Sequence, residues 1–109
     1  MAAGINNENL IEMCKEFSQI LARQGKPIWS ETFHKKALEI SAASSSLDMR
    51  EIYKGLIDSF MGGSGSLTDF VFYKNGKLLR EETNRFHFLL EKISEVAYQG
   101  LAEPEHNTD

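Results

Sequence analysis

The chain has 109 residues, of which 41% are hydrophobic and 26% are charged, and its formal net charge at pH 7 is −4. That length favours one domain with a real core, and the single Cys14 excludes an internal disulfide. An acidic chain is a poor match to nucleic acid, and no apolar run approaches the roughly 20 residues of a membrane span. We therefore expect a cytoplasmic protein that binds neither nucleic acid nor membrane.

Hydrophobic periodicity predicts two helices in the first part of the chain. The first runs from about residue 7 to residue 24, and Gly25 followed by Pro27 is a typical helix end. The second begins with Ser30 as its N-cap and continues to about Ala43.

A third amphipathic helix is predicted from about Leu47 to Met61, after a stretch of three serines that reads as a loop and cap. Its outer face carries an acidic ridge, made of Asp48, Glu51 and Asp58. A glycine-rich junction follows directly, and because glycine reaches positive φ without a clash it marks a sharp change of chain direction. The residues assigned to this structural turn are Gly62, Gly63, Gly65, Ser66 and Asp69.

The segment after the junction reads as a short β-hairpin and a last helix. Residues 70–73 have strand composition, and Asn75 with Gly76 is the strongest short-range hairpin signal. The return strand, residues 77–79, is very short. The last helix begins between Arg80 and Asn84 and reaches about residue 99, where Gly100 can end it.

Together these elements predict a mainly α fold over residues 1–109: a single-domain bundle of about four helices with a short β-hairpin before the last helix. Residues 1–7 and 103–109 are expected to be loose. Helices one, three and four form the central packing, and the second helix and the hairpin close its ends.

Motifs for catalysis or metal binding are weak in this sequence. The glycines follow a helix and precede a strand, which is the wrong order for a nucleotide-binding loop. The three histidines lie on different elements without metal-ligand spacing. Asp58 and Asp69 flank the junction and could do acid–base work as a small hydrolase, but Asp69 is better explained as a cap of the turn. We expect no enzyme activity, metal or cofactor.

Two features point to a protein partner. Phe88 lies on the polar face of the last helix, beside Glu91 and Glu95, and an aromatic ring in such a setting is a typical interface anchor unless the hairpin or the leader covers it. The acidic ridge is either a solvated face or a docking surface for a basic protein.

Residues 62–71 resemble a pattern of two glycines, a variable residue, a third glycine, a hydroxyl residue and, three residues later, an aspartate. The pattern is associated with small helical bacterial proteins similar to immunity proteins of polymorphic-toxin and contact-dependent growth-inhibition systems. Ser64 replaces the methionine often found at the variable position. The resemblance implies a protein that binds a cognate toxin, such as a nuclease with a basic surface, and occludes its active site. The alternative is a regulatory or adaptor protein that acts through helix–helix contacts.

Overall fold

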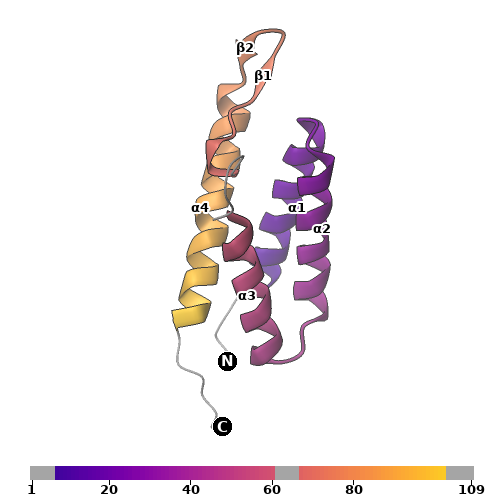
Figure 1. The fold of residues 1–109 in the computed structure, drawn as a ribbon, viewed down its shortest axis with the longest axis vertical. Helices are drawn as coiled ribbons and strands as arrows, with labels where there is room; N and C mark the ends of the chain where they lie inside the picture. Colours follow the sequence, from indigo (N-terminus) through magenta and orange to yellow (C-terminus); the bar gives the residue numbers. More distant parts are fainter. Residues whose placement is uncertain (1–6, 61–66, 103–109) are drawn as a thin grey trace.

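The computed structural model describes residues 7–60 and 67–102, which form a bundle of four helices running alternately up and down (Figure 1). The helices are α1 (Asn7–Arg23), α2 (Pro27–Ala42), α3 (Ser46–Phe60) and α4 (Arg80–Ala102). Between α3 and α4 lie a 3-10 turn, η1 (Leu67–Asp69), and two antiparallel strands, β1 (Tyr73–Lys74) and β2 (Lys77–Leu78). The predicted fold class is confirmed: a mainly helical bundle with a short hairpin before its last helix. Apart from Asn7, the ends expected to be loose lie outside the described residues.

The turn between α1 and α2 is fixed by Gly25, which has a φ of +75°. Its N–H donates to the carbonyl oxygen of Ala22 at 3.2 Å, and the N–H of Lys26 donates to that of Leu21 at 2.9 Å. This pair of bonds is a Schellman motif, which satisfies the last carbonyls of α1 and reverses the chain within three residues. The predicted end of the first helix is therefore confirmed.

The predicted start of the second helix is wrong, because α2 begins at Pro27 rather than after Ser30. Proline suits the first helical position, where its fixed φ matches the helix and its missing N–H has no partner to lose. Ser30 lies inside the helix and contacts α1 instead: the hydroxyl of Ser18 donates to the carbonyl oxygen of Ser30 at 2.8 Å, and the two hydroxyls are 3.1 Å apart.

The second helix is a full member of the bundle, so the prediction that it closes an end was wrong. A short connection makes α2 the antiparallel neighbour of α1 along its whole length, as Figure 1 shows. One phenylalanine from each helix meets at the centre, namely Phe17, Phe33, Phe60 and Phe86. The centroid of Phe17 lies 4.8 Å from that of Phe33 and 4.5 Å from that of Phe86, and Phe33 lies 5.6 Å from Phe60. These contacts tie all four helices to one core.

The hairpin turn is confirmed, but its strands are shorter than predicted. Asn75 and Gly76 have φ values of +55° and +79°, the pair of positive angles that a type I′ turn needs. The predicted first strand began at residue 70, whereas β1 begins at residue 73. The preceding residues pack instead of pairing: the ring of Phe72 lies 5.0 Å from that of Phe86, and the Phe72 N–H donates to Thr83 Oγ1 at 3.0 Å. Tertiary packing on α4 therefore replaces sheet pairing in this stretch.

The last helix continues through Gly100, so the prediction that this glycine ends it was wrong. A Cβ at position 100 would overlap the ring of Tyr53 on α3. The glycine thus permits a close approach of α3 and α4, which explains why a poor helix former is found inside a helix. Although α4 has 23 residues, none of the described helices is long and apolar enough to span a membrane.

Candidate partner-binding surface

Phe88 lies on the outer face of α4 and remains 45% exposed among the described residues. Two cations from the same helix flank its ring: the guanidinium carbon of Arg85 is 5.2 Å from the ring centroid, and Lys92 Nζ is 5.7 Å from it. The predicted exposed position of Phe88 is confirmed. The two cations follow from helical geometry, because positions i−3 and i+4 lie beside a side chain on the same face.

One of the two cations beside Phe88, the guanidinium of Arg85, is itself held by α1. Arg85 Nε and Nη2 donate to the two carboxylate oxygens of Glu16 at 2.7 and 2.8 Å. These hydrogen bonds lower the pKa of the Glu16 carboxyl below its usual value. A bidentate arginine–carboxylate pair has a defined geometry, so it restricts the rotamers of Arg85 and thereby orients the neighbouring ring. Phe88 therefore lies beside a side chain that α1 holds in place.

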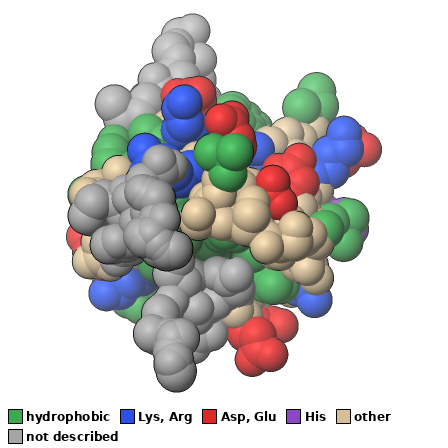
Figure 2. Space-filling model, turned by 90° about the horizontal axis from the view of Figure 1, so that it is seen from below, with side chains coloured by type: hydrophobic (Ala, Val, Ile, Leu, Met, Phe, Trp, Pro, Cys, Tyr) green, Lys and Arg blue, Asp and Glu red, His purple; other side chains and the backbone are tan. Residues whose placement is uncertain are grey.

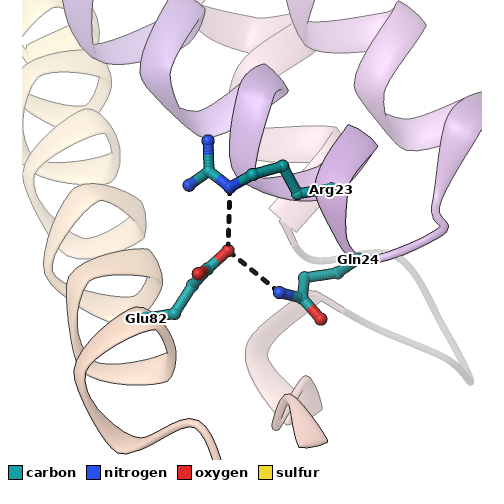
Figure 3. Close-up of polar contacts among 3 residues, drawn as sticks. All are labelled: Arg23, Gln24 and Glu82. Carbon is teal, nitrogen blue, oxygen red and sulfur yellow. Dashed lines mark hydrogen bonds and ion pairs between the residues drawn. The ribbon is translucent and has the colours of Figure 1, made fainter. Parts of the chain in front are cut away.

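A second polar contact joins the same two helices nearer the hairpin. In Figure 3 the carboxylate of Glu82 on α4 meets two side chains at the end of α1, Arg23 and Gln24. Its Oε2 accepts from Arg23 Nε at 3.3 Å and from Gln24 Nε2 at 2.9 Å. With the pair above, this contact makes the seam between α1 and α4 polar over two turns. Such partly exposed pairs contribute little stability each, but they fix the relative position of the two helices.

The other predicted residues near Phe88 are Glu91 and Glu95, both exposed on α4 one and two turns further along. Glu95 Oε1 lies 3.7 Å from Lys92 Nζ, so part of its charge is compensated. The helix places the ring and the two carboxylates together on one outward face, as the sequence predicted.

The acidic ridge on α3 has a partly structural role. The hydroxyl of Ser45 accepts from the Asp48 N–H at 3.1 Å, and the Asp48 carboxylate accepts from the Ser44 N–H, also at 3.1 Å. Ser45 is therefore the N-cap of α3, which confirms the predicted cap region, and Asp48 closes the turn before it. Glu51 and Asp58 are exposed. Figure 2, seen from the end of the bundle where α2 meets α3, shows acidic side chains mixed with basic and apolar ones.

Phe88 and the acidic ridge are not one patch. Tyr53 on α3 is level with Gly100 on α4, and Phe88 lies twelve residues before Gly100. Along the bundle axis the backbone of Glu51 is therefore about 18 Å or more from that of Phe88, and the backbone of Asp58 is about 10 Å from it. The two also face different sides, since Phe88 points outward from α4, whereas Gly55, on the line of the ridge, faces Lys36 of α2. At physiological salt the screening length is about 8 Å, so the ridge acts only weakly at Phe88.

Most of the predicted structural turn lies outside the described residues, including Gly62, Gly63, Gly65 and Ser66. Beyond it, Leu67 is fully buried, and Asp69 is exposed at the end of η1. The capping role of Asp69 therefore stays a prediction. The buried leucine shows that the chain is anchored to the core immediately after the glycines.

Chemically reactive groups are few among residues 7–60 and 67–102. This part of the chain holds no group of three or more His, Cys, Asp or Glu side chains that could bind a metal ion. Burial raises the pKa of the Cys14 thiol to about 12, so the thiol is neutral and inert at pH 7. Asp58 and Asp69, the residues of the hydrolase alternative, are both exposed. His87 Nε2 bonds the carbonyl oxygen of Phe70 at 2.7 Å and so secures the segment before the hairpin.

Comparison with protein-family models, with curated proteins and with solved structures found no match for this chain.

Proposed function

We propose that the protein is a non-enzymatic binding domain that acts as an immunity protein and neutralises a cognate toxin. The observation that carries the proposal is the half-exposed ring of Phe88, held beside an arginine that α1 fixes in place. Aromatic and arginine side chains dominate the energetic centres of protein interfaces. An anchor that is already oriented loses little conformational entropy when a partner covers it.

The energy available from this ring is enough to matter for binding. Phenylalanine offers an area of about 200 Å², and 45% of the residue is exposed, so a partner could cover about 90 Å². At about 25 cal/mol per Å² this burial stabilises a complex by about 2 kcal/mol, or roughly thirtyfold in affinity. Burial of this one ring does not give a stable complex by itself, so the interface needs further contacts around Phe88. Glu91 and Glu95 are the acidic groups on the same face that would meet a basic toxin surface.

The choice of an immunity protein among binding proteins depends on the resemblance of the glycine junction and on the small, acidic character of the chain. An inhibitor of this kind needs a rigid surface complementary to one partner and no reactive group. Many toxins of these systems are nucleases, whose substrate clefts are basic, and an acidic inhibitor approaches such a cleft quickly. The proposed mechanism is occlusion of the toxin's active site or substrate surface by the outward face of α4.

The experiment is a protection assay with the product of the neighbouring reading frame. If that frame encodes a large secreted toxin, its toxic domain should kill cells when expressed alone and spare them when expressed with this protein. Phe88→Ala should lose protection. Leu38→Ala is the matched control, because it removes an exposed apolar side chain from α2, away from the outward face of α4, and it should still protect.

Circular dichroism of each variant separates binding from folding. Undiminished killing in the presence of the wild-type protein would refute the immunity function and favour a regulatory or adaptor role. Full protection by Phe88→Ala would refute the proposed contact surface while leaving the function intact.

A further inference from the structure

A second surface lies at the hairpin end of the bundle, away from the centre of α4. There an open groove of about 700 Å³ separates the turn between α1 and α2 from the hairpin. Figure 1 shows the hairpin projecting beyond that turn. Tyr73 and Leu79 give the groove an apolar part. Its charged lining is Arg23, Lys74 and Glu82, and because Glu82 pairs with Arg23, Lys74 carries the net positive charge of the groove. Its size suits two or three side chains of an incoming chain.

This end of the molecule is basic although the chain as a whole is acidic. Residues 23–26 and 73–82 contain five Lys or Arg and only two carboxylates, in a chain of net charge −4. One of those carboxylates, Glu82, is already bound by Arg23 and Gln24. The unneutralised cations, among them Lys77 and Arg80, therefore create a positive potential that the whole-chain charge conceals.

The hairpin itself carries a charge arrangement that works against its own stability. Lys74 and Lys77 are directly opposite each other in the antiparallel register. Like charges at opposed positions are destabilising, and this ribbon has only one other pair, Tyr73 with Leu78, to offset the repulsion. An anionic partner would relieve that repulsion on binding, so the pair is better suited to a complex than to the free protein.

Apolar side chains accompany these cations. Tyr73 is 62% exposed and its cross-strand neighbour Leu78 is 44% exposed. Lys26, which follows the turn between α1 and α2, lies with its Nζ 4.9 Å from the ring centroid of Phe70, so this turn contacts the segment that precedes the hairpin. Exposed rings and aliphatic groups next to unneutralised cations fit a ligand that is both acidic and partly apolar.

We infer that the hairpin end binds an extended acidic peptide segment of a partner protein, whose carboxylates meet Lys74 and Lys77 while an apolar side chain enters beside Tyr73. Charge complementarity with the lysines favours a ligand of negative charge. The concave shape selects a narrow chain, because a bilayer surface cannot enter a groove between two turns. Single-stranded nucleic acid would need several stacking rings, and the described groove lining offers one. The site is separate from Phe88 and does not depend on the immunity function.

The test is fluorescence anisotropy with a fluorescein-labelled peptide of Asp-Glu-Leu repeats, titrated with the full chain. Binding should weaken as salt is added, and a peptide of Asn-Gln-Leu repeats should not bind. The variant K74E/K77E keeps a like-charged pair across the turn, so hairpin stability is matched, and it should bind the acidic peptide at least about tenfold more weakly. The control K35E/K54E makes the same change in net charge on exposed positions of α2 and α3, and should stay within about threefold of wild type.

Phe88→Ala should bind the peptide as the wild type does, which separates this site from the proposed toxin contact. Equal losses in the hairpin variant and the control would overturn the inference, because binding would then report net charge alone. So would failure of the acidic peptide to bind better than the neutral one. Tighter, Lys74- and Lys77-dependent binding of oligo-dT, or of phosphatidylcholine vesicles containing phosphatidylserine, would overturn it in favour of that class of ligand.

Discussion

Phe86 and Phe88 are two residues apart on one helix, yet their removal should have opposite consequences. Phe86 is fully buried, stacks on Phe17 at 4.5 Å and contacts Phe72 at 5.0 Å. Phe88 is 45% exposed and contacts the cations of Arg85 and Lys92. Alanine at the first position removes the link between the helices and the hairpin segment, whereas alanine at the second removes only surface contacts.

The two losses of stability differ by several-fold. Phe86→Ala should cost about 3–5 kcal/mol through lost burial and the cavity that remains. A domain of this length has about 5–15 kcal/mol in total, so this variant should be close to unfolding. Phe88→Ala should cost less than about 1 kcal/mol, the size of an exposed cation–π contact. With about 4 °C for each kcal/mol, the midpoints of thermal unfolding should fall by about 12–20 °C and by less than about 4 °C.

Urea denaturation followed by circular dichroism measures both values on the same scale, and the slope m should be unchanged if each variant remains two-state. A loss of about 3 kcal/mol or more for Phe88→Ala would contradict this reasoning. The ring would then belong to the core, and the proposed partner-binding surface would lose its anchor.

Four further outcomes are expected. Gly100→Ala should lower the free energy of unfolding by about 1–3 kcal/mol despite the better helix propensity of alanine, because the new methyl group overlaps the ring of Tyr53. Gly55→Ala, which meets only the movable end of a lysine side chain, should instead raise it by up to about 1 kcal/mol in the same thermal melts. Lys74→Glu alone should stabilise the fold by up to about 1 kcal/mol, because an ion pair replaces a like-charged pair across the turn; a loss of stability would show that the lysines do not repel. The hydrogen bond from Arg85 lowers the pKa of Glu16 in the folded state. The contribution of this ion pair to the free energy of unfolding is therefore complete above the unfolded-state pKa of Glu16 and is lost as pH falls through the folded-state pKa. Because Glu16→Gln removes this titrating group, the variant should lose stability less steeply between about pH 5 and pH 2 in urea titrations.

Local signals in the sequence predicted the elements well. The Asn75-Gly76 turn was predictable because few dipeptides adopt two positive φ angles. The end of α1 was predictable because the residue after the helix needs a positive φ, which Gly25 adopts without strain. The start of α2 was misjudged because two local signals competed, a proline at N1 and a serine cap. The serine in fact bonds Ser18 on another helix, which local sequence does not show.

Packing between distant segments explains the other errors. Phe72 has a strand-like sequence but packs on α4, and Gly100 resembles a helix stop but makes room for Tyr53. Of the candidate site, the exposure of Phe88 followed from its place on the helical wheel. The cations at i−3 and i+4 were visible in the same pattern, but the bond from Arg85 to α1 spans 69 residues and needed the fold. The basic hairpin end was missed because net charge averages over the whole chain.

The most direct test of the partner-binding account is surface-binding kinetics against the product of the neighbouring reading frame, the proposed toxin, at two salt concentrations. Phe88→Ala should weaken binding by about thirtyfold, mainly through a faster off-rate, while the variant E51K/D58K, altered on the acidic ridge, should change the on-rate by less than about threefold. An unchanged off-rate for Phe88→Ala, together with strongly slowed and salt-sensitive association for E51K/D58K, would contradict the account and place the partner on α3.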